Sequence, residues 1–258
     1  MESKGIGRDE LDAFLRDVLA VDGFVDYGPN GLQIEGRERI HCIGFAVSAT
    51  RDSVLAAVER GADALVVHHG LFWDFSGARP LTGALARRVF PLVRGGVNLF
   101  SYHLPLDAHP QLGNAAGLAG QLDAKDLLPF GDYKGRPTGL KGVLTKPINA
   151  VALRDLIEAR LRHPVLLASF DESAIIKTVG IITGGANKDW RLAVSEGLDA
   201  YLTGEMSEHD WHESQEAGIH MFAAGHHATE VFGVQSLMRL LSEKFDLDCF
   251  YIDSKNPA

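Results

Sequence analysis

Histidines and carboxylates follow three apolar runs of this chain, and we interpret each run as a buried strand. His68 and His69 follow the first run, His103 and Asp107 the second, and His226 and Glu230 the third. Such side chains can converge when they lie at the carboxyl ends of parallel strands, because open α/β sheets build their sites at that edge. Imidazoles and carboxylates that converge in this way indicate a metal site.

The first two groups can be interpreted in more than one way. Successive strand residues face opposite sides of a sheet, so one of the pair His68 and His69 could be buried and the other solvated. Past the end of the strand this alternation lapses, and neighbouring imidazoles can then reach two adjacent ions. Pro105 lies between His103 and Asp107, which excludes a regular helix there and leaves a loop or the entry to a helix.

The third group leads into the last helix, which we expect from about Val231 to Phe245. The spacing of four residues places His226 and Glu230 on one face of its first turn. In the alternative, His226 solvates the start of the helix and Glu230 complements the helix dipole. Three such groups at equivalent strand ends favour the metal site over three coincidences.

The chain repeats itself, since residues 43–69 align with residues 179–205 at a constant offset of 136 and without a gap. Both copies run from a strand through a helix and a glycine stop to a second strand, and then through another helix to a third. Strands that alternate with helical segments of roughly 10–15 residues indicate βαβ units and largely parallel sheets. The identical positions are Gly44, Ala57, Val58, Gly61, Asp63 and Ala64, matched by Gly180, Ala193, Val194, Gly197, Asp199 and Ala200.

We therefore predict an α/β fold of two related three-layer α/β/α domains with largely parallel or mixed sheets. The first domain covers residues 1–130 and the second residues 131–258. The tail of about residues 240–258 is a candidate to pack on the first domain. A helix with Leu153, Ile157 and Leu161 at helical spacing is expected to end before Pro164.

Several other residues have weaker patterns. Glu205 holds in the second copy the position that His69 holds in the first, so it either lines the same cleft or is a solvated carboxylate. The turn of residues 183–185 is interpreted as a tight strand-to-helix turn rather than an anion cradle. Phe72 and Trp73 could stack a heterocycle at the mouth of the site, although aromatic residues beside strands more often belong to a core. Three histidines are assigned to the surface or the core: His209, His212 and His220.

Composition excludes some classes of function. The chain has 258 residues and a formal net charge of −9, with no dense run of Lys or Arg, which argues against binding to nucleic acid or acidic lipid. No stretch approaches the ~18 apolar residues of a membrane helix, and the N-terminus lacks the apolar core of a signal peptide. Cys42 and Cys249 are interpreted as inert, reduced core residues. A cytoplasmic protein with small-molecule or protein partners is expected.

Seven segments resemble the NIF-three-like family, also called GTP cyclohydrolase I type II homologs, and especially its short bacterial members. They are DYGPNGLQIEG, ADALVVHHGLFW, HLPLDAHPQLGN, TGGA, DAYLTGE, AAGHHATE and FYIDSKNPA. The resemblance covers essentially the whole chain in order. It implies two interlinked α/β domains, a centre of two metal ions, and a homohexameric ring with sites that face an internal cavity. Carried over position by position, the family's metal ligands fall on His68, His69, Asp107, His226 and Glu230.

This ligand set has three imidazoles, two carboxylates and no thiolate, which suits two divalent ions of zinc, iron, manganese or nickel. Two ions roughly 3.5–4 Å apart need a bridging group, and either Glu230 or Asp107 can bridge. Such a pair makes hydroxide available at neutral pH. His103 lies outside the ligand set, where it could move a proton or orient a ligand.

These observations favour a metal-dependent hydrolase. The activity that the family name implies is the opening of a purine ring in GTP or a similar small molecule. The alternative is a metal-binding or protein-interaction scaffold without enzymatic activity, because the family is named after a protein partner. Both hypotheses need the same ligands, so the ligands do not distinguish them.

Overall fold

The strand that ends in the two adjacent histidines lies in the middle of a five-stranded sheet in the computed structural model, which describes residues 5–258. The sheet is parallel except for one antiparallel edge strand. A separate antiparallel pair is formed by β1 (Ile6–Gly7) and β3 (Arg39–Ile40). In order, the strands of the larger sheet are β13 (Asp248–Tyr251), β4 (Cys42–Ser48), β5 (Ala64–His69), β6 (Asn98–Ser101) and the antiparallel β2 (Gly31–Ile34).

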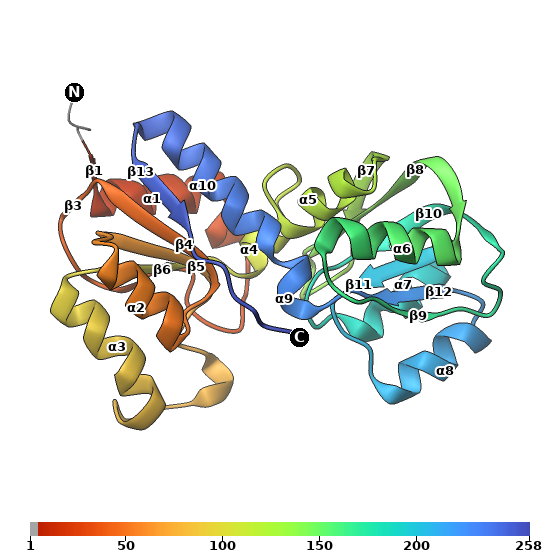
Figure 1. Cartoon of the computed structure of the whole chain (residues 1–258), viewed down its shortest axis with the longest axis horizontal. Helices are drawn as coiled ribbons and strands as arrows, with labels where there is room; N and C mark the ends of the chain where they lie inside the picture. Colours follow the sequence, from red (N-terminus) through yellow and green to blue (C-terminus); the bar gives the residue numbers. More distant parts are fainter. Residues whose placement is uncertain (1–4) are drawn as a thin grey trace. The chain divides into compact units, whose positions relative to one another are not determined.

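Helices cover both faces of this sheet (Figure 1). On one face lie α1 (Arg8–Val18) and α10 (Val231–Phe245), whose Phe14 and Phe245 rings meet edge to face at 5.0 Å. On the other face lie α2 (Arg51–Glu59) and α3 (Gly83–Gly95), which share an apolar core with alternate residues of β5 such as Leu65 and Val67. Two short 3₁₀ turns, η1 (Val21–Gly23) and η2 (Asp74–Ser76), lie in the connections.

A second, mixed sheet has six strands. The three central strands that match the repeat are parallel to one another, and the remaining pairings are antiparallel. The order is β7 (Ala124–Phe130), β8 (Gly139–Asn149), β10 (Ile175–Ile181), β11 (Ala200–Thr203), β12 (His220–Ala223) and β9 (Leu166–Ala168).

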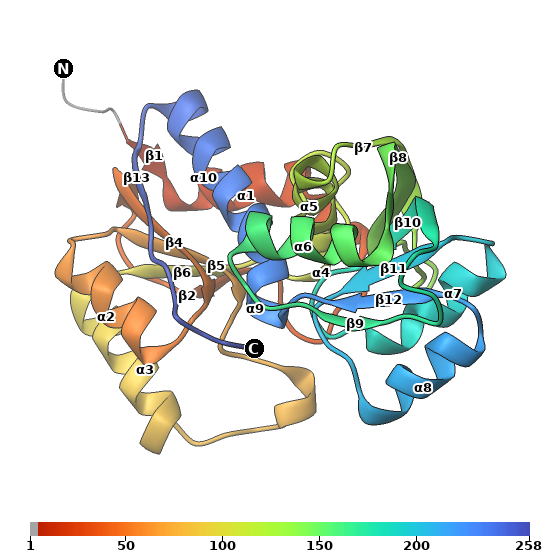
Figure 2. The same cartoon turned by 45° about the vertical axis from the view of Figure 1, so that its right-hand side comes forward.

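This second sheet also has helices on both faces (Figure 2). Leu118 of α5 (Asn114–Gln121) and Leu153 of α6 (Ala150–Leu161) pack into a core on one face. Trp190 of α7 (Trp190–Ser195) belongs to a separate core on the opposite face, where α8 (Glu208–Glu216) also lies. Short turns complete the chain: α4 (Leu104–Asp107), η3 (Asn187–Asp189) and α9 (His226–Thr229). The predicted fold class, two related α/β/α domains with parallel and mixed sheets, is confirmed.

The internal repeat is visible in individual hydrogen bonds. Asp63 Oδ2 accepts the backbone N–H groups of residues 41 and 42 at 2.9 and 3.1 Å. Asp199 Oδ2 accepts those of residues 177 and 178, both at 2.8 Å. Gly61 and Gly197 end the preceding helices with φ values of +71° and +69°, which is the left-handed conformation that glycine adopts without strain. All of these positions differ by the same offset of 136, so the two sheets share one local design.

The compact units of the structure divide at different residues from the predicted domains. One unit contains the described residues up to Leu106 together with Gly233–Lys255, and the other contains Asp107–Phe232 with Asn256–Ala258. Residues 107–130 belong to the second unit because β7 pairs with β8, and α5 packs under the same sheet. The segment that returns to the first unit begins at Gly233 rather than near residue 240. Most of α10 belongs to this unit, together with β13, which is a strand of its sheet.

Other predicted elements lie where they were expected. The helix with Leu153 and Ile157 ends at Leu161, and Arg162 caps it in a left-handed conformation with φ at 53°. The last helix covers Val231–Phe245 as predicted. Among residues 5–258, none of the helices combines the length and the apolar character that crossing a bilayer requires.

Candidate metal centre

Three histidines meet at the carboxyl ends of β5 and β6. His68 and His69 are the last two residues of β5, and His103 follows β6. One ligand nitrogen from each ring lies within 4.8 Å of the other two. The ring centroids of His68 and His69 are 4.6 Å apart, and that of His103 lies 5.0 Å from His68. The expected convergence of imidazoles from two neighbouring strand ends is therefore present within this unit.

The Nδ1 atom of each of these rings has a hydrogen-bond partner in the protein. His68 Nδ1 lies 3.0 Å from the carbonyl oxygen of Tyr102, which can only accept, so this nitrogen carries the proton. His69 Nδ1 lies 3.0 Å from Ser48 Oγ, at the end of the neighbouring strand β4. In a neutral ring with a protonated Nδ1, the lone pair is on Nε2, the atom that can bind a metal ion.

His103 has a carboxylate as its Nδ1 partner. Asp26 Oδ1 lies 2.7 Å from His103 Nδ1, and the Asp26 side chain is only 2% exposed. Its other oxygen accepts the Asn30 side-chain amide and the Leu104 backbone N–H, both at 2.9 Å. Burial acts to raise the pKa of the Asp26 carboxyl, but these donors, with His103 first among them, hold it below its ordinary value. Asp26 is therefore an ionised acceptor that fixes the orientation of the His103 ring.

In the second unit, His226 lies between two carboxylates. Its Nε2 is 3.2 Å from Glu230 Oε1, and its Nδ1 is 2.5 Å from Glu205 Oε1. Burial acts to lower the pKa of His226, but Glu230 and Glu205 together raise it to about 9. Glu230 is 3% exposed whereas Glu205 is 52% exposed. Glu205 thus orients the His226 ring from the solvent side, and the buried Glu230 shares the Nε2 side.

The turn that precedes η3 packs directly against this pair. A Cβ atom on Gly184 would lie 2.1 Å from Glu230 Oε1 and 3.1 Å from His226 Nε2, and the φ of Gly184 is +69°. Gly184 N–H also donates to Thr229 Oγ1 at 3.1 Å. Gly184 therefore permits a close approach to the carboxylate, which agrees with the prediction of a tight strand-to-helix turn at residues 183–185.

The sequence analysis placed His226 and Glu230 on the first turn of the last helix, and this prediction is wrong. They bracket a separate one-turn helix, α9, and Glu230 interrupts the helix with φ at −106° and ψ at 10° before α10 begins. The spacing of four residues still brings both side chains to one face, because α9 itself supplies the helical turn.

Asp107 is the last residue of α4 and is 7% exposed. Its Oδ1 accepts the Asn114 side-chain amide at 2.8 Å and the Thr183 hydroxyl at 3.2 Å. Two donors on the same oxygen fix the rotation of the carboxylate. Pro105 occupies the first turn of α4, so the predicted alternative of a helix entry between His103 and Asp107 is the one present.

The residues fit a divalent ion in their chemistry. Nitrogen ligands that are oriented by Nδ1 partners, together with buried carboxylates, are the groups that zinc, iron, manganese and nickel bind in proteins. Within the first unit these groups are the three histidines, and within the second unit they are His226, Glu230 and Asp107. The described residues therefore contain groups that could hold a metal ion.

The remaining predicted residues fall into distinct places. The side chains of His209 and His212 are 47% and 65% exposed. His220 is buried, and its Nδ1 lies 2.8 Å from Ser169 Oγ. Phe72 packs against the core on the α2 and α3 face, whereas Trp73 meets the His103 ring edge-on at 5.1 Å.

Comparison with known proteins identifies the family. The model of the Duf34/NIF3 (NGG1p interacting factor 3) family matches residues 6–257. The chain belongs to the Duf34/NIF3 family. A "GTP cyclohydrolase 1 type 2 homolog" from Pasteurella multocida is 41% identical over 249 residues, which cover 96% of this chain and 98% of the relative.

Two solved structures agree with this assignment to Duf34/NIF3. One, described as "Structural genomics, protein ybgI, unknown function", has a TM-score of 0.92 and 39% sequence identity, and the match covers 98% of this chain and all of that one. A crystal structure of a protein from Thermus thermophilus has a TM-score of 0.89 and 31% identity, with 98% of this chain and 100% of that chain covered. The predicted resemblance to this family is confirmed.

The sequence analysis missed the residues that orient the imidazoles. The Asp26 side chain is buried, and the only local signal for it was its place at the start of DYGPNGLQIEG, a segment with the turn residues Pro29, Asn30 and Gly31. Ser48 had a signal in its register, because it ends the strand next to the one that ends in His69. The Tyr102 partner is a backbone carbonyl, which no pattern of side chains reveals.

Proposed function

We propose that this Duf34/NIF3 protein is a metal-dependent hydrolase with a centre of two divalent ions. The proposed ligands are His68, His69, Asp107, His226 and Glu230. The observation that carries the proposal is the shared orientation of the imidazoles. His68 and His69 each contact a protein carbonyl or hydroxyl oxygen through Nδ1, which leaves Nε2 for a ligand. His226 contacts Glu205 through Nδ1 and the buried Glu230, another proposed ligand, through Nε2.

The bound ions would supply Lewis acidity and generate a nucleophile from water at neutral pH. In the proposed mechanism, His103 Nε2 accepts a proton from the reacting water or delivers one to the leaving group. Asp26 holds the proton on His103 Nδ1, so the exchange takes place at Nε2 alone. Glu230 and Asp107 balance the positive charge of the centre, because both are buried carboxylates.

The proposed substrate is a purine nucleotide or a similar small molecule. The support is the name of related proteins, GTP cyclohydrolase 1 type 2 homologs, which are about as long as this chain. Hydrolytic opening of the imidazole ring of a purine needs a nucleophilic water and a group that moves protons. The proposed metal ligands and His103 would provide these two functions.

A substrate screen on reconstituted protein tests this proposal. Metal-free protein would be loaded with zinc, manganese, iron or nickel, and ring opening of GTP and related purine nucleotides would be followed by absorbance and mass spectrometry. Glu230→Gln serves as the inactive variant, and Glu243→Gln is its matched control, because Glu243 is exposed on α10. Turnover by the wild type and the control, but not by Glu230→Gln, is expected. Full metal loading without turnover of any purine nucleotide would instead favour the scaffold function.

Two further expectations remain part of the proposal. We propose a homohexameric ring, on the basis of family resemblance, and light scattering at several concentrations should give the mass of six chains. A mass of one chain at every concentration would contradict the ring. A cytoplasmic location is proposed as well, and the two free cysteines agree with a reducing compartment.

A further inference from the structure

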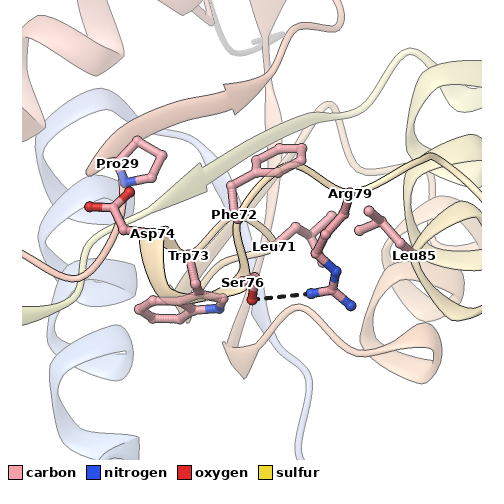
Figure 3. A pocket seen from close by; sticks show the side chains of 9 residues that line it. Pro29, Leu71, Phe72, Trp73, Asp74, Ser76, Arg79 and Leu85 are labelled. Carbon is pink, nitrogen blue, oxygen red and sulfur yellow. Dashed lines mark hydrogen bonds between the residues drawn. The ribbon is translucent and has the colours of Figure 1, made fainter.

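A cavity of about 350 Å³ lies within the first unit of the chain. Its walls come from the loop that follows β5 and from the start of α3, and Figure 3 shows the lining side chains. Leu71, Phe72 and Leu85 provide apolar surface, while Asp74, Ser76 and Arg79 provide polar groups. The Asp74 carboxylate lies beside Pro29, apart from the Arg79 guanidinium (Figure 3). This volume lies within the range of small-molecule sites, which combine apolar walls with a few polar groups.

Trp73 connects this cavity to the candidate metal centre. Its indole lines the cavity and also lies 5.1 Å from the His103 ring and 6.1 Å from the His69 ring. The exposed Phe75 ring already stacks on the indole, with the ring centroids 5.7 Å apart. A planar ring in the cavity would therefore replace Phe75 or use the opposite indole face, while another part of the same molecule faces the imidazoles. Indole faces favour such offset stacking with aromatic partners.

The backbone that carries Trp73 is held on both sides. Leu71 N–H donates to Gln33 Oε1 at 2.8 Å, and Asp74 N–H donates to the Tyr27 carbonyl at 2.8 Å. Gly28 packs so closely that a Cβ atom there would lie 2.4 Å from the Phe72 carbonyl oxygen. The wall of the cavity is thus largely formed before a ligand binds, which reduces the entropy lost on binding.

Arg79 supplies a positive charge at this cavity. Its guanidinium donates to Ser76 Oγ at 3.3 Å, and in Figure 3 the Trp73 indole lies on the other side of that hydroxyl. Within residues 5–258, no carboxylate lies at ion-pair distance from this guanidinium. Its planar set of donors matches the oxygens of a phosphate or a carboxylate.

We propose that this cavity binds a planar heteroaromatic compound that carries an anionic group. The ring stacks on Trp73, and the anion binds Arg79. The inference rests on the proposed function and deepens it, because it assigns the substrate-binding residues beside the candidate metal centre. Phosphate and carboxylate share the chemistry that Arg79 recognises, and the choice between them is made by experiment.

Calorimetry on the metal-free protein tests the cavity separately from the metal chemistry. The probes are guanosine 5′-monophosphate, guanosine without the phosphate, and nicotinate as a heteroaromatic carboxylate. Arg79→Gln should weaken binding of an anionic probe about tenfold, or about 1.4 kcal/mol, and leave guanosine binding unchanged. Trp73→Leu should weaken the binding of all three probes, and Trp73→Phe should restore most of the affinity. If Arg79→Gln weakens binding of the nucleotide but not of nicotinate, the cavity has a phosphate site. If it weakens binding of nicotinate but not of the nucleotide, the cavity has a carboxylate site.

Matched controls are available on the same chain. Arg87→Gln changes an exposed arginine of α3 that does not line the cavity, and Trp211→Leu changes an exposed tryptophan of α8. Both should bind like the wild type. The inference is overturned if the wild type binds none of the probes, or if Arg79→Gln and Trp73→Leu bind as the controls do. Metal content and turnover, measured on the same variants, report on the proposed function separately.

Discussion

Asp26 and His103 form a buried carboxylate–imidazole pair, with 2.7 Å between Asp26 Oδ1 and His103 Nδ1. The carboxylate is enclosed by Tyr27, Asn30 and Leu104 as further donors. The backbone N–H of His103 in turn donates to Asn30 Oδ1 at 2.7 Å. The turn of residues 26–31 therefore fixes both the backbone and the ring of His103, next to the two histidines that end β5.

Asp26→Asn is expected to lower hydrolytic turnover by about 10–100-fold, the usual cost of removing a partner that orients a functional histidine. The amide no longer forces the proton onto Nδ1, so Nε2 is protonated in part of the molecules. Turnover as a function of pH is the measurement, and the profile should shift together with the rate. Asp17→Asn, an exposed substitution on α1, should leave both unchanged. An unaltered rate and profile in Asp26→Asn would show that the pair is structural.

His103→Ala is expected to keep most of the metal but to lower turnover by about 10²–10⁴-fold, because this residue is proposed to move a proton. Since Asp26 is proposed to act through His103, adding Asp26→Asn to this variant should cause no further loss. Metal content and turnover are measured on the same samples. If His103→Ala loses its metal as fully as a ligand variant does, His103 is a ligand and the proposed role is wrong.

Glu230→Gln is expected to keep the fold and to weaken metal binding by more than about 100-fold, which exceeds the cost of losing an orienting partner. The amide preserves the shape of the side chain but removes a buried negative charge that offsets the cations. Circular dichroism should match the wild type, while elemental analysis should show loss of metal. Retention of the full metal content by this variant would remove Glu230 from the ligand set.

Much of the fold could be predicted from the sequence because its signals are local. The glycine stops at Gly61 and Gly197 and the carboxylates of Asp63 and Asp199 recur at one offset, and the structure gives both copies the same hydrogen bonds. Ligand-type residues at strand ends were likewise visible as a pattern. Such local signals can be recognised in the sequence without knowing which distant strands pair.

The features that could not be predicted depend on contacts between distant segments. Asp26 and His103 are 77 residues apart, and a turn signal alone does not show where its carboxylate points. The division between the units depends on the pairing of β7 with β8, which a βαβ pattern does not contain. The break between α9 and α10 at Glu230 leaves the spacing of the site residues unchanged, so the helical periodicity did not reveal it.

The two cysteines should react slowly with thiol reagents in the native protein. Burial is the main reason that the pKa of Cys42 rises from its ordinary value of 9.0 to about 11 and that of Cys249 to about 12. At pH 8 a rise of about two units leaves roughly 100-fold less thiolate on Cys42, and the thiolate is the reactive form. Labelling should accelerate as the pH approaches 11 and should be fast at pH 8 in urea. Native labelling at pH 8 as fast as in urea would contradict the burial of both thiols.

The number of metal ions per chain tests the central claim most directly. Five proposed ligands exceed what one four-coordinate ion with an open position requires, so the account predicts two ions. The protein would be purified without chelator, reconstituted with a divalent metal, dialysed, and analysed for metal and protein content. Two equivalents per chain are expected. A content that never exceeds one equivalent after reconstitution would contradict the proposed two-metal centre.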